Sequence, residues 1–134
     1  MTEIRICFAD TDAGGVVYYG HYLRFLEQGR TEFLRDRGLS VRELHDKGSF
    51  LPVIHLEIDY RAPALLDDLV RVETALLETA GATFTLSQKV IRSADGKLLV
   101  DAKLTLACIG PDGRPRRLPP ALVEALQKPE PDRK

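Results

Sequence analysis

A single segment with the hydrophobic period of a helix constrains the fold of this chain most. Between residues 18 and 35 the apolar side chains recur at three- and four-residue intervals, while charged residues such as Arg24 and Glu27 fall between them. Gly29 lies on the apolar side, where the missing side chain lets a helix approach its support closely, at a cost of about 1 kcal/mol relative to alanine. The pattern predicts an amphipathic helix of about five turns that ends near Gly38. Its predicted apolar face consists of Tyr18, Tyr22, Phe25, Leu26, Gly29, Phe33 and Leu34.

Most of the remaining chain has the two-residue period of β-strands. Four segments after the helix alternate apolar and polar residues, and the sequences "TAGA" and "SADG" that separate the last three are typical of hairpin turns. A weaker alternation in "IRICFA" predicts a short strand before the helix. The predicted strands are residues 4–9, 53–61, 70–76, 84–90 and 98–108. The predicted buried face of the second of these strands consists of Ile54, Leu56, Ile58 and Tyr60.

Two short helices complete the predicted order of elements. Ser40 is placed to cap a helix over "VRELHDKG", with Glu43 three residues on, and "LPPALVEALQK" has proline in the first turn of another helix. This order predicts an α+β fold in which an antiparallel sheet of about five strands wraps around the long central helix. Leu99, Ala107 and Ile109 interrupt the polar face of that sheet, so we expect a second subunit to cover part of the face or to extend the sheet at an edge.

The length and composition are those of a small globular protein. We expect the 134 residues to form one domain, residues 1–128, followed by a frayed tail, residues 129–134. The formal net charge of -1 gives no electrostatic reason to expect nucleic acid as a partner. No apolar run approaches the roughly 20 residues of a membrane helix, and no secretory signal is evident, so we expect a cytoplasmic protein without membrane insertion. In that compartment Cys7 and Cys108 are expected to be reduced and at least half buried.

Two aspartates one residue apart, Asp10 and Asp12, precede the long helix. Counting Asp10 as the first position of a calcium loop puts Asp12 third and Gly15 sixth, but the twelfth position is His21 rather than a bidentate glutamate. The three histidines show no zinc-ligand spacing with the cysteines or with each other. We therefore expect no metal, and no cofactor of another kind is implied.

Two interpretations of the aspartates remain open from the residues alone. An aspartate before a helix commonly caps free backbone amides or stabilises the positive end of the helix dipole, and Asp10 fits this role. Asp12 precedes Ala13, Gly14 and Gly15, and the glycines let the backbone approach a ligand beside the unpaired amides of a helix N-terminus. A carboxylate in that setting is able to attack an acyl carbon while the amides stabilise the acyl oxygen. Asp12 is therefore either a cap or a catalytic carboxylate.

The stretch "DTDAGGVVYYGHYLRFLEQGRTEFLR" resembles the signature D-x-D-x-x-G-V-V-Y of the 4-hydroxybenzoyl-CoA thioesterase family of hot-dog proteins, which includes the YbgC-type acyl-CoA thioesterases. "LPVIHLEIDYRAPALLDDLVRVET" resembles the second and third strands of that family, and those of enzymes that act on 1,4-dihydroxy-2-naphthoyl-CoA. The resemblance spans roughly residues 4–126. It implies a hot-dog fold and a thioesterase that hydrolyses an acyl-CoA to the free acid and CoA.

The resemblance also implies roles for individual residues. Asp12 would attack the thioester carbonyl as a nucleophile or act as general base for water. The backbone amide of Tyr19 would polarise the thioester oxygen, and the helix dipole would add to this effect. We expect further substrate contacts from Gly15, Val17, Tyr18 and His21. The candidate cations for the CoA phosphates are Arg61, Lys89, Arg92, Lys103 and Arg116.

The chain departs from the family pattern at two places. YbgC-type members commonly read V-Y-H-x-N-Y, where this chain has Tyr19 in place of the histidine and His21 in place of the asparagine. The tyrosine is closer to the hydroxybenzoyl enzymes and suits an aromatic or bulky acyl group. "TAGAT" replaces the basic cluster that those enzymes use for the nucleotide phosphates. His21 is then either a proton donor to the leaving thiolate or a surface residue.

The resemblance implies a homodimer or a dimer of dimers, that is a homotetramer, with the acyl chain near a subunit interface. Three alternatives to a general acyl-CoA thioesterase remain: a specialised hydrolase for dihydroxynaphthoyl-CoA or hydroxybenzoyl-CoA, an enzyme that takes acyl groups from acyl carrier protein, and a non-catalytic acyl-binding hot-dog protein.

Another hot-dog branch uses a glutamate on the central helix. The polar-side positions of Glu27 and Glu32 instead favour surface pairing with Arg24 or Arg35.

Overall fold

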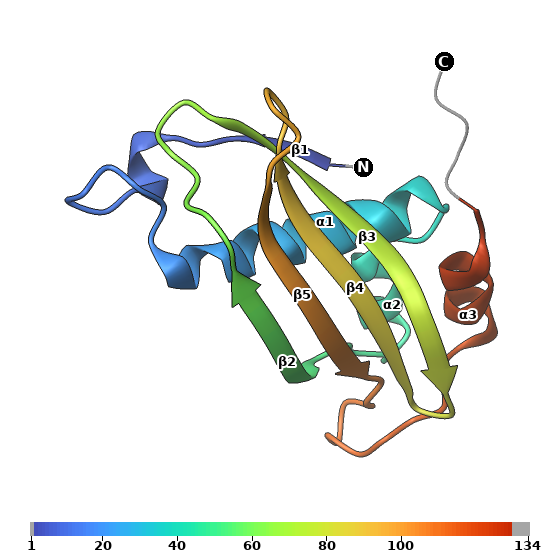
Figure 1. The fold of residues 1–134 in the computed structure, drawn as a ribbon. Coiled ribbons are helices and arrows are strands. Elements are labelled where there is room, and N and C mark those ends of the chain that lie inside the picture. Colours follow the sequence, from blue (N-terminus) through green and yellow to red (C-terminus); the bar gives the residue numbers. More distant parts are fainter. Residues whose placement is uncertain (1, 130–134) are drawn as a thin grey trace.

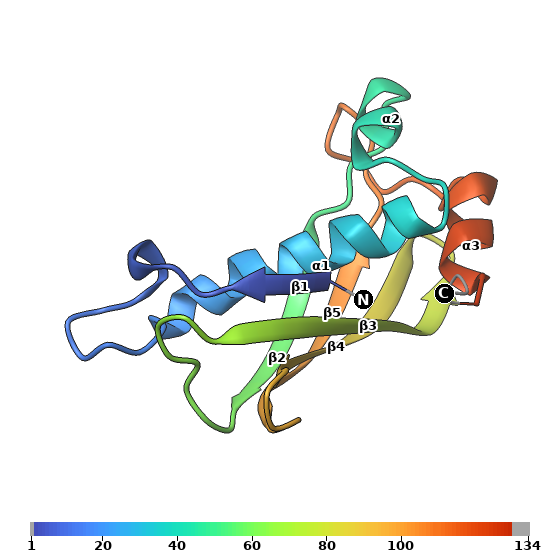
Figure 2. The ribbon, with the colours of Figure 1, turned by 90° about the horizontal axis from the view of Figure 1, so that it is seen from above.

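The computed structural model describes residues 2–129, which form one antiparallel sheet of strand order β1-β3-β4-β5-β2 and three α-helices. Helix α1 lies along one face of the sheet, and α2 and α3 lie near its C-terminal end (Figures 1 and 2). The predicted α+β hot-dog arrangement is confirmed, while the predicted tail lies outside the described residues apart from Pro129. The strands are β1 (Thr2–Arg5), β2 (Val53–Tyr60), β3 (Leu69–Ala80), β4 (Thr83–Arg92) and β5 (Leu98–Ala107). The helices are α1 (Tyr22–Asp36), α2 (Val41–Asp46) and α3 (Pro120–Gln127), and two 3-10 turns, η1 (Phe8–Asp10) and η2 (Tyr19–His21), precede α1.

Helix α1 begins later than its apolar period predicts. It starts at Tyr22, because the three residues before it form the tighter turn η2, and Tyr18 is 50% exposed rather than buried. The other six residues of the predicted face are buried. At the C-terminal end Gly38 has a φ of +85°, and the N–H of Leu39 donates to the carbonyl of Leu34 at 3.0 Å. The predicted end near Gly38 is confirmed as a glycine cap.

The close approach of α1 to the sheet centres on Gly29. A Cβ atom at Gly29 would lie 2.5 Å from Cγ1 of Val72 on β3, closer than a side chain tolerates. Beside this contact the fully buried Gln88 of β4 donates from Nε2 to the backbone carbonyl of Leu26 and to the hydroxyl of Thr74, both at 2.9 Å. Gln88 therefore joins the helix backbone to two central strands, and the sequence pattern did not predict this buried polar contact.

The first strand is displaced from its predicted position. β1 covers Thr2–Arg5 rather than residues 4–9, because the chain turns away from the sheet into η1. This turn leaves Phe8 80% exposed. Cys7 is also exposed, not half buried as predicted, whereas Cys108 is buried, and both thiols are free.

The predicted buried face of β2 is only partly buried. Leu56 and Ile58 are half-buried against the core, but Ile54 is 59% exposed and Tyr60 is 46% exposed. β2 is the last strand of the sheet and pairs with β5 on one side only, while α1 lies over β1, β3 and β4. The alternation indicated the direction of these side chains, but within residues 2–129 Ile54 and Tyr60, at opposite ends of the strand, stay partly exposed.

Leu99 is buried without the second subunit that the sequence led us to expect over it. The pairing of β4 with β5 shifts register near the end of β4, and beside this irregularity Leu99 and Val100 have no exposed surface. The carbonyl of Leu99 also accepts hydrogen bonds from the N–H groups of Arg61 and Ala62. Exposed apolar side chains of the sheet lie on β2 and at Leu77 of β3 rather than at Leu99.

The predicted turns and short helices are confirmed. Gly81 and Gly96, with φ of +62° and +71°, lie in the turns after β3 and β4. Ser40 caps α2, since its hydroxyl accepts from the N–H of Glu43 at 3.0 Å, and α3 begins at Pro120. Among residues 2–129, no helix has the length and apolar character needed to span a membrane.

The Gly29 contact leads to a prediction about stability. We expect Gly29→Ala to lower the free energy of unfolding by about 1–3 kcal/mol, because overpacking against Val72 outweighs the better helix propensity of alanine. Urea unfolding measures the difference. The double variant Gly29→Ala/Val72→Ala is the control, since the smaller residue on β3 makes room for the new methyl group and the combined loss should be smaller than the sum of the single losses. A Gly29→Ala protein as stable as wild type would contradict the contact.

Candidate active site

Asp12 lies in a short exposed loop that projects beyond the sheet (Figure 1). The N–H of Asp12 donates to the carbonyl of Val16 at 2.9 Å, and Gly15, with a φ of +79°, donates back to the carbonyl of Asp12 at 3.0 Å. The carboxylate takes part as well, because its Oδ1 accepts from the N–H of Gly14 at 2.8 Å. Its second oxygen, Oδ2, has no hydrogen-bond partner among the described residues. The predicted glycine turn thus presents one free carboxylate oxygen on an exposed side chain.

The base of this loop is attached to the connection between β2 and β3. The N–H of Val17 donates to the carbonyl of Ala64 at 3.0 Å, and the N–H of Ala64 donates to the hydroxyl of Tyr22 at 2.9 Å. Asp68 ends this connection and accepts from Nε of Arg92 at 3.1 Å, a bond that raises the pKa of Arg92. Arg92, one of the candidate cations for CoA phosphates, is therefore already paired.

Asp10 has a structural role, but the amide that it accepts from is that of Cys7, whereas its position before the helix predicted an amide of the long helix. It is only 5% exposed, and its Oδ2 accepts from the N–H of Cys7 at 2.7 Å. Its Oδ1 lies 2.8 Å from Nε2 of His21 and 3.8 Å from Nη1 of Arg24. The His21 ring also packs edge-on against Phe25, with 5.4 Å between centroids. Asp10 therefore joins η1 to the start of α1, and His21 has a pairing that neither sequence interpretation of it suggested.

Two backbone amides at the start of the helix lack an acceptor. The turn η2 runs directly into α1, and the N–H groups of Tyr19 and Gly20 have no hydrogen-bond acceptor within residues 2–129. The amides on either side are used: Tyr18 donates to the carbonyl of Asp10 at 3.2 Å, and His21 donates to the carbonyl of Tyr18 at 2.9 Å. Free N–H groups at the positive end of a helix favour an anionic or polarised oxygen.

Three tyrosines surround these amides. The rings of Tyr18 and Tyr19 lie 4.6 Å apart, and the ring of Tyr60 meets Tyr19 edge-on at 6.3 Å between centroids. The hydroxyl of Tyr60 donates to the backbone carbonyl of Tyr19 at 3.0 Å. Gly20 leaves room for this arrangement, because a Cβ there would lie 2.8 Å from Cε2 of Tyr18. The sequence placed Tyr60 on a buried strand face and gave no signal that it contacts the turn.

Two other predicted substrate contacts lie apart from the free carboxylate oxygen. Val17 is buried, so its side chain belongs to the core although its backbone closes the loop. Arg61 lies 3.9 Å from the carboxylates of both Asp59 and Asp101, at the edge of the sheet. It makes no ion pair with the Asp12 loop in the part of the chain that the structure describes.

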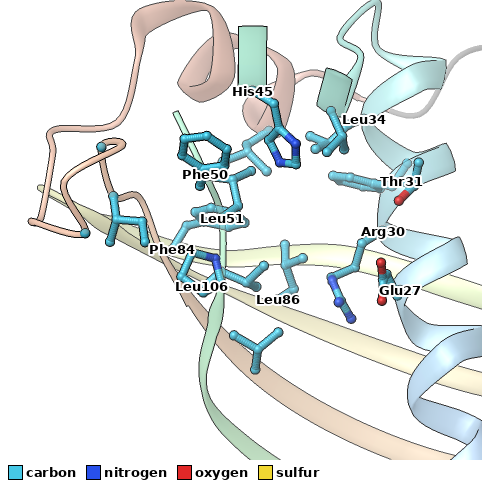
Figure 3. Close-up of a pocket in the computed structure, with 18 of the residues that line it drawn as sticks. Glu27, Arg30, Thr31, Leu34, His45, Phe50, Leu51, Phe84, Leu86 and Leu106 are labelled. Atoms are coloured by element: carbon cyan, nitrogen blue, oxygen red, sulfur yellow. The ribbon is translucent and has the colours of Figure 1, made fainter. Parts of the chain in front are cut away.

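A cavity of about 720 Å³ lies beside the second half of α1, beyond the helix N-terminus that Asp12 precedes (Figure 3). Arg30 and Glu27 line it from α1. Glu32 pairs with Arg35 at 2.6 Å as expected, whereas Glu27 makes no ion pair with Arg24 or Arg35 in the described part of the chain. Burial lowers the pKa of Arg30, and the nearby Glu27 carboxylate partly offsets this effect. The sequence did not reveal the cavity, since its walls come from distant segments. Its apolar walls include Leu34, Phe50, Leu51, Phe84, Leu86 and Leu106.

Within the described residues, no three or more His, Cys, Asp or Glu side chains come together as a metal site would require. The two aspartates therefore act separately rather than as part of one acidic cluster. Asp10 is buried and hydrogen-bonded, and Asp12 is exposed.

The contrast between the two aspartates leads to a prediction. We expect Asp10→Ala to lower the free energy of unfolding by about 2–4 kcal/mol, because the N–H of Cys7 and the side chain of His21 lose a buried partner. Asp12→Ala is the matched control and should change stability by less than about 1 kcal/mol, because an exposed carboxylate that caps one amide contributes little. Urea unfolding of both variants measures the difference, and equal losses would contradict the assignment of separate roles.

Comparisons with known proteins assign the family. Residues 6–126 match the model of the thioesterase-like superfamily. The chain is 35% identical over 126 residues to the acyl-CoA thioester hydrolase YbgC of Escherichia coli O6:H1, covering 93% of each protein. It is 40% identical over 107 residues to the acyl-CoA thioesterase YbgC of Haemophilus influenzae, covering 79% of this chain and 77% of the relative. The crystal structure of Slr0204, a 1,4-dihydroxy-2-naphthoyl-CoA thioesterase from Synechocystis, matches with a TM-score of 0.86 and 26% identity over 93% of each chain. The chain therefore belongs to the thioesterase-like superfamily and is a thioester hydrolase with a hot-dog fold.

Proposed function

We propose that this protein hydrolyses the thioester of an acyl-coenzyme A to the free acid and coenzyme A, with Asp12 as nucleophile or general base. The observation that carries the proposal is the free Oδ2 of the exposed Asp12 on the loop that leads into the unpaired amide of Tyr19. The family assignment supports the reaction class. We further propose that the protein acts in the cytoplasm and needs no metal or other cofactor.

Two routes use the same groups. In the nucleophilic route a carboxylate oxygen of Asp12 attacks the carbonyl carbon, the C–S bond breaks as CoA thiolate leaves, and water cleaves the resulting mixed anhydride. In the general-base route Asp12 takes a proton from water, which attacks the carbonyl directly, and the C–S bond breaks as CoA thiolate leaves and takes up that proton. Negative charge develops on the thioester oxygen in both routes. The amide of Tyr19 would stabilise this charge, and one such donor typically contributes about 2.7–4 kcal/mol.

The acyl group would bind near a subunit interface, beside the cavity along α1. The cavity walls are mostly apolar, and a volume of about 720 Å³ is in the range of small-molecule sites. Leu51, Pro52 and Val53, at the start of β2, form one side of it. Because β2 is the edge strand, a second copy that packs along this strand would also border the cavity.

An aromatic acyl group of the dihydroxynaphthoyl or hydroxybenzoyl kind is the second candidate substrate. The rings of Tyr18, Tyr19 and Tyr60 beside the free amides support it, since aromatic groups pack favourably edge to face. Acyl groups from acyl carrier protein and a non-catalytic acyl-binding role are the remaining alternatives. The proposed substrate contacts are Gly15, Val17, Tyr18 and His21, with Arg61 as a cation for the CoA phosphates.

Replacement of the carboxylate tests the proposed function. We expect Asp12→Asn to reduce kcat by roughly 10²-fold or more, because a positioned base or nucleophile is lost. Release of free thiol from acetyl-, long-chain and benzoyl-type CoA esters measures the rate. Glu32→Gln is the control, since this carboxylate pairs with Arg35 on the helix surface and its loss should leave kcat within about twofold of wild type.

The same assay separates the alternatives. Equal rates for wild type and Asp12→Asn would remove Asp12 from the mechanism. If wild type released thiol from none of the esters while direct titration showed that it binds one of them, the non-catalytic binding role would replace the enzymatic one. The ester with the highest kcat/KM identifies the acyl class.

Self-association as a homodimer or dimer of dimers is also part of the proposal. β2 has unpaired backbone groups along its outer edge, and its side chains include the 59% exposed Ile54 and the 39% exposed Val53. An open apolar edge strand favours pairing with another chain. The second subunit would thereby cover surface that a single chain leaves in water.

A charged residue on this strand tests the association. We expect wild type to sediment as a dimer or tetramer and Ile54→Asp to shift toward monomer, because a carboxylate would have to be desolvated at the interface. Leu66→Asp is the control, since Leu66 is 44% exposed but lies in the β2–β3 connection. A wild-type protein with the sedimentation coefficient of a monomer would contradict the proposed assembly.

A further inference from the structure

Tyr60 links the edge of the sheet to the turn that carries the free amides. It lies at the end of β2, opposite Val100 of β5, and its hydroxyl donates to the backbone carbonyl of Tyr19 at 3.0 Å. Its ring also packs against Tyr19, at 6.3 Å, and against Tyr22, at 5.7 Å between centroids. A strand residue 41 positions away in the sequence thus contacts the turn through both a hydrogen bond and its ring.

Tyr19 is fixed on three sides by these contacts. Its carbonyl accepts from Tyr60, and its ring lies between those of Tyr60 and Tyr18. The peptide that precedes it is fixed as well, because the carbonyl of Tyr18 accepts from the N–H of His21. In a planar trans peptide the C=O and N–H groups point in opposite directions, so the N–H of Tyr19 is directed away from the turn. The carbonyl of Tyr19 belongs to the next peptide, whose N–H is that of Gly20, the second amide without an acceptor among residues 2–129. The Tyr60 bond therefore holds this peptide and, with it, the turn that carries both free amides.

We propose that Tyr60 is a positioning residue for the thioester oxygen site, acting through the backbone of Tyr19. The inference rests on the proposed function, in which the amide of Tyr19 stabilises charge on that oxygen. Donors that are already oriented stabilise developing charge without reorganising during the reaction, so a looser turn would be a poorer catalyst even where substrate still binds. Tyr60 need not touch the reacting atoms.

The protonation state of Tyr60 suits this role. Burial raises the pKa of its hydroxyl, with a smaller contribution from Tyr19, so the proton that it donates stays bound at neutral and mildly alkaline pH. A purely structural role for the same hydrogen bond would alter stability without a specific effect on kcat. The two roles therefore differ in a measurable way.

The test compares Tyr60→Phe with Tyr22→Phe. Both variants lose a hydroxyl from the same tyrosine cluster and keep the ring, but Tyr22 accepts from the N–H of Ala64 instead of bonding the turn. We expect Tyr60→Phe to reduce kcat by about threefold to tenfold, the range for one neutral hydrogen bond, with KM within about twofold of wild type. Tyr22→Phe should keep kcat within about twofold and lose more thermal stability, because its bond is buried.

Nitrogen chemical shifts report the hydrogen bond without an activity assay. The shift of a backbone nitrogen responds to hydrogen bonding of the carbonyl in the same peptide, so Gly20 reports on the carbonyl of Tyr19. In protein labelled with 15N-glycine, the Gly20 resonance should move in Tyr60→Phe and stay in place in Tyr22→Phe. An unmoved Gly20 resonance in Tyr60→Phe would overturn the contact on which the inference depends.

Asp12→Asn, assayed on the same ester, separates this inference from the proposed function. Wild-type kcat in Asp12→Asn would overturn the proposed function itself. If Asp12→Asn is inactive while Tyr60→Phe keeps wild-type kcat, or changes KM alone, the positioning role is overturned and the proposed function stands. A fall in kcat for Tyr60→Phe that Tyr22→Phe does not share would support the positioning role.

Discussion

The contact of α1 with the sheet at Gly29 is the constraint on which the rest of the structure depends. Without a side chain at this position the helix backbone comes against Val72, near enough for the buried Gln88 to donate to the carbonyl of Leu26. A glutamine in a core has to be fully bonded, so this contact fixes how far along the sheet the helix lies as well as how closely it packs. The helix N-terminus is thereby placed beside the β2–β3 connection, where Tyr22 and Ala64 are hydrogen-bonded.

The aspartate pair shows how burial distinguishes two identical side chains, one with a structural role and one with the proposed catalytic role. Asp10 is buried, accepts from the N–H of Cys7 and lies 2.8 Å from Nε2 of His21, which joins the loop to the helix start. Asp12, two residues on, is exposed, and among residues 2–129 its hydrogen bonds stay within its own turn. A carboxylate with a free oxygen, such as that of Asp12, is available to react. A carboxylate whose two oxygens both have partners, such as that of Asp10, holds the structure together instead. The substitution of His21 for the family's usual asparagine also becomes intelligible, because histidine provides the partner for Asp10.

The features proposed to act in catalysis lie at the margins of the fold. The Asp12 loop projects beyond the sheet, Tyr60 ends the edge strand, and the cavity begins beside the first residues of that strand. A single chain leaves much of this surface in water, although catalysis by charge stabilisation favours sites from which water is excluded. The proposed pairing of subunits along β2 would supply that cover. The same edge strand would then both pair with the second subunit and, through Tyr60, hold the η2 turn in place.

The order of the main elements and the candidate catalytic residues could be predicted from the residues alone. The 3.6- and two-residue periods predicted the central helix and most of the sheet, and the glycines after Asp12 predicted the turn that presents its carboxylate, because side-chain direction and turn geometry depend on neighbouring residues. Four features became visible only in the folded chain: where α1 begins, that Ile54 and Tyr60 on the predicted buried face of β2 are exposed, that Gln88 is bonded in the core, and that Tyr60 reaches Tyr19. These outcomes depend on which distant segments meet, and no local period encodes whether a strand lies at an edge or what lies opposite a side chain.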